Sequence, residues 1–204
     1  MKFKVTLVAA LAAITSLAAF SNASAAVSPE LQAALGVFRA APALYPVTAG
    51  QLPSEVLEMY KTHPTLGGSV DASAARGVNA GVTGGQVVLV PAGQGVCFST
   101  PNLLKTGGVA GCSSLADIQA GLAFSDPSGD SVGRKRVPPV TFTAVVPDSV
   151  HYITFVTFHG ERIKVPAHDN IVEAELSPFK SFIMNGVKHK SGYKQAKAKH
   201  HKGK

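Results

Sequence analysis

Apolar side chains recur at two different periods along the chain, and each period predicts a different kind of element. Leu31, Leu35 and Phe38 follow one another at helical spacing. Ser28-Pro29, just before them, is a typical pair of N-cap and first helical residue. The pattern therefore predicts an amphipathic helix over residues 29–41.

A second short helix is predicted over residues 54–61, where Val56, Leu57 and Tyr60 are apolar. The stretch that follows, residues 62–85, is rich in glycine, alanine, serine and threonine, which is typical of loops. We therefore expect residues 26–85 to form a segment of helices and loops in front of the main domain.

From residue 86 the pattern changes to short β-branched runs. Residues 86–98 hold two such runs around a glycine-rich turn, which predicts a β-hairpin. Ser114, followed by Asp117 and then by Gly121, predicts one short helix with a cap at each end.

The C-terminal third of the chain has the most regular pattern. Strands are expected at residues 140–146, 150–158, 161–165 and 171–176, with a two-residue turn at His159-Gly160. The last of these strands has alternating charged and apolar positions, so we expect it to be half exposed.

The strand at 150–158 is apolar on both faces, which is typical of a central strand. We expect three of its side chains, Phe155, Val156 and Phe158, to lie in the core. On the next strand Ile163 and Val165 share one face, and Arg162 and Lys164 share the other.

The first 25 residues resemble an export signal. Lys2 and Lys4 precede an apolar run, 5–20, and the small residues Ala23-Ser24-Ala25 follow it. This order predicts a signal peptide over residues 1–25. The alternative is an uncleaved membrane anchor, but the run is shorter than the roughly 20 residues that span a bilayer. We expect an exported chain that meets a membrane only through its signal peptide.

Export changes how the two cysteines, Cys97 and Cys112, are interpreted. A single pair in an exported chain favours a disulfide, worth about 3 kcal/mol across a loop of this length. The alternative is a catalytic thiolate, which needs a histidine partner and a reduced thiol. The expected fold is then mainly β: an antiparallel β-sandwich or small barrel over residues 86–187, with short N-terminal helices and one disulfide.

The formal net charge of +7 is concentrated at the C-terminus. Residues 26–187 hold ten basic and twelve acidic side chains, whereas residues 188–204 hold seven lysines and no acid. A slightly acidic body argues against specific nucleic-acid binding by the fold. The C-terminal segment has little apolar surface to bury, so we expect a disordered basic tail over residues 188–204.

Outside the cell such a tail would attract anionic polymers of the cell wall by charge, in a way that salt weakens. The residues expected to bind them are Lys188, Lys190, Lys194, Lys197, Lys199, Lys202 and Lys204. The alternative is a tail that only solubilises the protein. Its histidines could bind zinc or copper loosely, but we expect no cofactor and no metal site.

Two segments of the chain carry a resemblance to a known family. The matching residues are Val88–Pro91, Gly95–Cys97, Cys112, Val146–Val150, Gly160, Val165–Pro166 and Asp169–Val172. With them the chain resembles a family of small exported proteins and ectodomains from high-GC Gram-positive bacteria that has no settled activity. The resemblance implies a related fold and export, and it implies no catalytic residues. Ser149 stands where the family has glycine.

In the body of the chain, the side chains most suited to catalysis or metal binding are those of His151, His159 and His168. In a straight strand His151 and His159 would lie about 26 Å apart, too far to share a metal ion. His168 and Asp169 are neighbours that would point to opposite faces, so they make a weak acid–base pair. We therefore expect a secreted or wall-associated, non-enzymatic surface protein. The alternative is an envelope hydrolase or metal-dependent enzyme that uses His151 or His168.

Overall fold

The computed structural model describes residues 27–48, 51–52, 54–62, 70–79, 85–100, 109–125 and 140–191. Within these residues no helix is both long and apolar enough to cross a membrane. The expected signal peptide, residues 1–25, lies outside the described residues, and so do five of the tail lysines: Lys194, Lys197, Lys199, Lys202 and Lys204.

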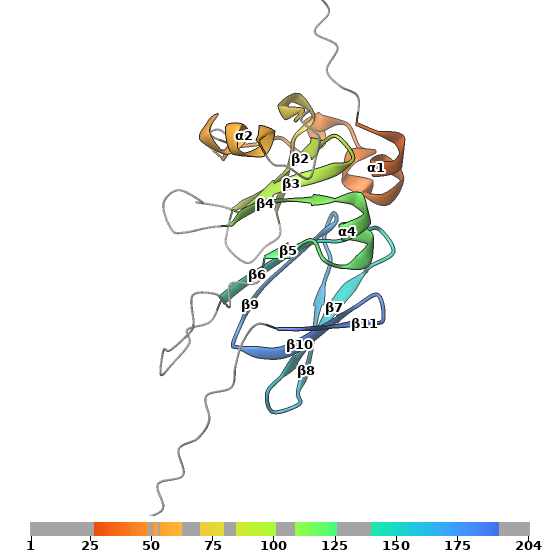
Figure 1. The fold of residues 1–204 in the computed structure, drawn as a ribbon, viewed down its shortest axis with the longest axis vertical. Coiled ribbons are helices and arrows are strands. Elements are labelled where there is room, and N and C mark those ends of the chain that lie inside the picture. The colour runs from red at the N-terminus through yellow and green to blue at the C-terminus, as the bar shows by residue number, and fades with distance from the viewer. Residues whose placement is uncertain are drawn as a thin grey trace, which may run out of the picture.

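The described strands form three antiparallel sheets, which confirms the mainly β fold class (Figure 1). The first sheet has the order β1 (Arg76–Asn79), β2 (Gln86–Ala92), β3 (Gly95–Ser99), β4 (Ala110–Ser114). The second has the order β5 (Phe124–Ser125), β6 (Val140–Val145), β9 (Ile171–Leu176). The third has the order β11 (Val187–Lys190), β10 (Phe179–Met184), β7 (Tyr152–Thr157), β8 (Arg162–Pro166). In the described part of the chain none of them closes into a barrel.

Short helices connect and cover these sheets. They are α1 (Pro29–Ala34), α2 (Ser54–Lys61) and α4 (Leu115–Ala120), with 3-10 turns η1 (Gly36–Phe38), η2 (Pro42–Leu44) and η3 (Ala72–Ala74). The helix α2 has the predicted bounds. The predicted caps of α4 are also confirmed: the Asp117 N–H donates to Ser114 Oγ at 3.1 Å, and Gly121 has a φ of 78°.

The strands β2 and β3 of the first sheet are buried on both faces. On one face Val90 packs with Val56 and Tyr60 of α2. On the other face Leu89 packs in a core that includes Leu31 of α1 and side chains of the second sheet. In Figure 1, α2 accordingly lies above the first sheet and the second sheet lies below it.

The second and third sheets pack face to face around a cluster of phenylalanines. The Phe142 ring of β6 lies edge-on to the Phe155 ring of β7, with centroids 4.9 Å apart. Phe179 and Phe182 of β10 complete the cluster, at 5.0 Å from Phe155 and 5.3 Å from Phe142 respectively. Edge-to-face packing of this kind favours a well-defined core. This pair of sheets is the sandwich-like part of the molecule.

The strand β7 is central in the third sheet, as predicted, because it lies between β10 and β8. Phe155 is fully buried. Val156 and Phe158, which we expected in the core, are only half-buried. The reason is that Val156 points to the outer face of the sheet, away from the phenylalanine cluster, and Phe158 lies in the turn beyond the strand.

That turn is one residue longer than the sequence predicts. The Gly160 N–H donates to the Thr157 carbonyl at 3.1 Å, and the Thr157 N–H donates to the Glu161 carbonyl at 2.9 Å. Three residues therefore lie between the hydrogen-bonded Thr157 and Glu161, and the last of them, Gly160, takes the left-handed conformation with a φ of 87°. A three-residue loop with glycine in this position is a common hairpin connection.

The helix predicted over residues 29–41 is shorter in the structure, because α1 ends before Leu35. Leu35 has an extended backbone, with φ −126° and ψ 102°. The next N–H group, that of Gly36, donates to Asp148 Oδ1 at 2.7 Å instead of continuing the helix. The carboxylate of Asp148, which is distant in sequence, thus replaces the helical carbonyl as the acceptor. The local spacing of apolar residues does not predict this replacement.

The strand β1 lies in the stretch 62–85, which we expected to be loop. Its Val78 is paired with Val87 of β2 and is fully buried. Arg76, also on β1, is 3% exposed, and its guanidinium donates to the carbonyls of Val37, Ala74, Ala75 and Ala40. Tertiary contacts therefore order a segment whose composition is typical of loops.

The strand β11 crosses the expected boundary between domain and tail at residue 188. The turn before it is formed by Asn185 and Gly186, both with positive φ. This turn returns the chain along β10, so that Lys188 is opposite Ile183. The expectation of disorder is therefore wrong for Lys188–Lys190.

The strand β9 has the predicted bounds but is more buried than expected. Ile171 points into the core beneath the first sheet, and Val172 points into the phenylalanine cluster. Even Glu173 is only 3% exposed, and Glu175 is exposed. The second sheet is an inner layer with packed groups on both sides, and β9 is therefore more buried than its alternating pattern predicts.

Candidate functional site

The outer face of the third sheet carries cations at both of its edges. Directly paired residues of antiparallel strands point to the same face, so the register defines rows of side chains across the sheet. The first row is Lys188, Ile183, Thr154 and Lys164, and the second row is Lys190, Ser181, Val156 and Arg162. All four cations are exposed. Neighbouring strands lie about 4.8 Å apart, so the backbone positions of the two cations in a row are about 14 Å apart. We call these two rows the cationic face.

No carboxylate offsets these charges within the third sheet. The strands β7, β8, β10 and β11 contain no Asp or Glu, and their cations are Arg162, Lys164, Lys180, Lys188 and Lys190. The acidic strand residues Glu173 and Glu175 belong to β9, in the second sheet. A body that is slightly acidic as a whole therefore has one strongly basic face.

A groove of about 720 Å³ lies along part of the first row of the cationic face, from Ile183 to Lys164. Thr154, Arg162, His151 and the turn residue Asn185 also line it, whereas Lys188 does not. Tyr152, also in the lining, is 47% exposed, and the Lys164 Nζ lies 4.6 Å from the centre of its ring. This cation–π contact orients the ammonium group at the groove wall.

The sequence identified only half of this face. It marked Lys188 and Lys190 as binding residues but placed them in a tail. It put Arg162 and Lys164 on a common face, as the structure shows, but gave them no role. A usable signal was the Asn185-Gly186 dipeptide, which is typical of two-residue hairpins and would have predicted β10 and β11.

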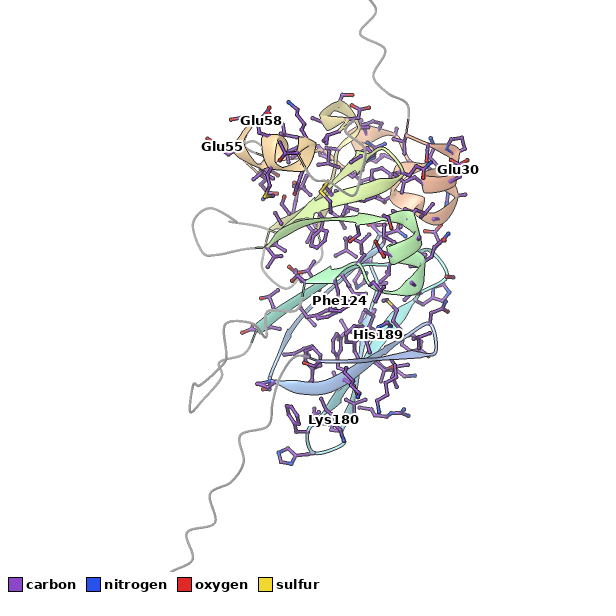
Figure 2. All side chains as sticks on the ribbon, viewed as in Figure 1. Glu30, Glu55, Glu58, Phe124, Lys180 and His189 are labelled. Atoms are coloured by element: carbon purple, nitrogen blue, oxygen red, sulfur yellow. A yellow bond between two sulfur atoms is a disulfide. The ribbon has the colours of Figure 1, made fainter. Side chains whose placement is uncertain are left out.

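His189 lies between the two lysines of β11 but points to the opposite, inner face. Its ring stacks on that of Phe182, with centroids 4.8 Å apart, and Figure 2 shows it beside Phe124. Burial lowers the pKa of His189. Its Nε2 is buried and has no hydrogen-bond partner among the described residues. His189 thus packs as a neutral ring and does not belong to the cationic face.

A second, smaller cavity of about 390 Å³ lies beside Asp148. The Asp148 carboxylate accepts hydrogen bonds from the Gly36 N–H and from Asn170 Nδ2, both at 2.7 Å. It also forms an ion pair with Arg39 Nη2 at 2.6 Å. Burial alone would raise the pKa of Asp148, but the contacts with Asn170, Gly36 and Arg39 together lower it. These contacts attach the N-terminal segment to the C-terminal half of the chain.

Of the three histidines that the sequence singled out, His151 lines this cavity together with Asp148 and Asp169, and it also lines the groove of the cationic face. The Asp169 carboxylate accepts a hydrogen bond from the Tyr45 hydroxyl at 2.9 Å. His159 and His168 are exposed and do not line the cavity. The described residues contain no group of three or more His, Cys, Asp or Glu side chains that could hold a metal ion.

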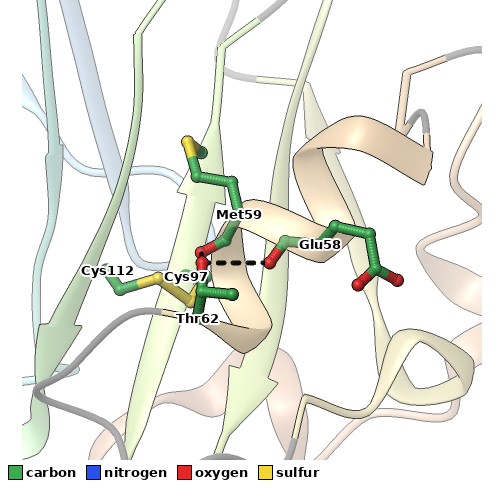
Figure 3. The surroundings of a disulfide bond; sticks show 5 residues. All are labelled: Glu58, Met59, Thr62, Cys97 and Cys112. Carbon is green, nitrogen blue, oxygen red and sulfur yellow. Dashed lines mark hydrogen bonds between the residues drawn. A yellow bond between two sulfur atoms is a disulfide. The ribbon is translucent and has the colours of Figure 1, made fainter.

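The disulfide between Cys97 and Cys112 is present, as predicted. The two cysteines are directly paired across β3 and β4, with Cα atoms 3.9 Å apart. Figure 3 shows the bond next to the end of α2, where Thr62 Oγ1 donates to the carbonyls of Glu58 and Met59. Since both sulfurs are bonded to each other, neither cysteine is available as a thiolate nucleophile.

Comparisons with protein-family models, with curated proteins and with solved structures found no match to this chain.

Proposed function

We propose that the chain is an exported, non-enzymatic protein of the bacterial envelope that binds anionic wall polymers through its basic C-terminal segment. The observation that supports this most strongly is the position of β11. This strand displays Lys188 and Lys190 on the surface of the folded body, directly before a segment with five more lysines and no acid. The segment thus begins on a sheet that is itself basic.

Two further features fit an exported protein. The disulfide between Cys97 and Cys112 suits an oxidising compartment. The sequence of residues 1–25 has the order of a signal peptide. In the envelope the basic segment would retain the protein on polymers that carry phosphate or carboxylate groups, because opposite charges attract over about one Debye length.

The contacts of the cavity beside Asp148 give the enzyme alternative less support. A general base needs a positioned acid or carboxylate partner. The Asp148 carboxylate already accepts from Gly36 and Asn170, and the Asp169 carboxylate already accepts from Tyr45. These bonds give both carboxylates a structural role beside His151.

The test removes positive charge from the C-terminal segment without changing the length of the chain. In the full mature chain the five lysines after β11 are changed to glutamine; a matched control changes the same five to arginine. Binding to isolated cell walls should weaken strongly in the glutamine variant and persist in the arginine variant. Binding of the unaltered protein should fall between about 0.05 and 0.5 M salt, as the Debye length shrinks from roughly 14 to 4 Å. Equal, salt-insensitive binding by all three proteins would refute the proposal.

A further inference from the structure

We infer that the cationic face is a binding site in its own right, and that the groove along its first row holds a linear acidic polysaccharide. This inference rests on the proposed function, because it names the folded part of the binding surface and the class of polymer. It concerns Arg162 and Lys164 of β8, which lie far from the C-terminal segment in sequence.

The arrangement of charge supports an extended anionic ligand. Lys164 and Lys188 end the first row, and Arg162 and Lys190 end the second, so cations stand on both sides of the face. The two cations of each edge strand are two residues apart. At 3.3–3.4 Å per residue, their backbone positions are about 7 Å apart. A single small anion would engage one edge, whereas a chain with repeated charges can engage both. The protein's own basic segment has the same sign of charge as this face, so charge complementarity favours an anionic polymer as the occupant.

The groove lining favours a polymer of sugar rings over a simple chain of phosphates. Between the charged ends, the first row contains one hydroxyl, that of Thr154, which is 8% exposed, and one half-buried apolar side chain, Ile183. The half-exposed ring of Tyr152 and the amide of Asn185 continue this mixture at the end of the groove. Sugar rings have apolar C–H faces and hydroxyl edges that match such a lining. Arg162 offers the planar fork that suits carboxylates.

The experiment measures binding of the full mature chain to polygalacturonate by titration calorimetry, with polyphosphate as a charge-only ligand. Lys164→Gln should weaken polygalacturonate binding about twofold to fivefold, the effect of losing one exposed ion pair. Lys61→Gln on α2 is the control: it removes one exposed cation, ion-paired with Glu58, that does not line the groove, and it should leave binding unchanged. Thr154→Val keeps the branched shape and removes the hydroxyl, so it should weaken binding of polygalacturonate but not of polyphosphate.

The outcomes separate this inference from the proposed function. If Lys164→Gln and Thr154→Val bind polygalacturonate as the unaltered protein does, the groove is not the site, even where the five-lysine glutamine variant loses wall binding. If Lys164→Gln weakens both ligands equally and Thr154→Val weakens neither, the face binds charge alone and the polysaccharide assignment is overturned. If the groove variants lose binding while the five-lysine variant keeps it, the groove is supported and the C-terminal segment is not the binding element. Unchanged melting curves confirm that each variant is folded.

Discussion

The carboxylate of Asp148 accepts a 2.7 Å hydrogen bond from the backbone N–H of Gly36, 112 residues earlier in the chain. This bond occurs where the predicted helix would have continued, and it attaches the start of the described chain to the loop before β7. Asn170 strengthens the junction, since its side chain accepts from the Val37 N–H at 3.0 Å and donates to Asp148 Oδ1. The junction contains a charged group with a shifted pKa, and this makes its contribution to stability measurable.

Asp148 should make stability depend on pH in the acid range. Its folded-state pKa lies below the usual value of about 3.9, so its contribution is present above that value and is lost as pH falls through the folded-state pKa. Asp148→Asn should lower the free energy of unfolding at neutral pH by about 1–2 kcal/mol, a modest figure because the side chain is partly exposed. It should also flatten the pH profile below pH 4.

Urea unfolding at several pH values measures both effects, and Glu161→Gln in an exposed turn is the control. An unchanged profile in Asp148→Asn would show that the junction adds nothing.

Loss of the disulfide should destabilise the first sheet. Replacing both Cys97 and Cys112 with alanine should reduce the free energy of unfolding by about 2–5 kcal/mol, because the bond closes a loop in the unfolded chain. The unaltered protein under reducing conditions should behave like the double variant. Intact mass without reductant should be two hydrogens lower than with it. Alkylation of two thiols in the native, unreduced protein would contradict the bond.

Phe155 and Val156 are neighbours on β7 that point to opposite faces, which makes them a matched pair. Phe155→Ala removes a fully buried ring from the phenylalanine cluster and should cost about 3–5 kcal/mol. Val156→Ala alters a half-buried side chain on the outer face and should cost no more than about 1 kcal/mol. Thermal or urea unfolding of the two variants compares the faces directly. Similar losses for both would mean that the outer face is covered by another layer.

His189 should destabilise the edge of the third sheet when it becomes charged. Burial lowers its folded-state pKa below the usual value of about 6.5, so the unfolded chain binds a proton more readily. The contribution of neutral His189 is therefore present above about pH 6.5 and is lost as pH falls through the folded-state pKa. His189→Phe keeps the stacking on Phe182 and should remove this part of the pH dependence. His159→Gln, in the exposed turn, is the control. A slope that persists in His189→Phe would assign the effect to other groups.

Local sequence determined the elements that depend on short-range chemistry. The caps of α4 follow from Ser114 and Gly121, because a side-chain acceptor and a left-handed glycine are the groups that end a helix wherever it packs. The disulfide was predictable because the chain has only two cysteines and an export-like start. The central position of β7 followed from its apolar faces, which are a property of the strand itself.

Only the tertiary structure decided the features that depend on residues far apart in sequence. The early end of α1 requires Asp148, and the burial of Arg76 requires the carbonyls of Val37 and Ala40. The cationic face is of the same kind. Arg162 and Lys164 share it with Lys188 and Lys190 because β7 and β10 lie between them in a fixed register, and a shift of one residue would turn one pair to the opposite face. Alternation along each strand gives the two faces, but strand pairing decides which charges meet on one of them.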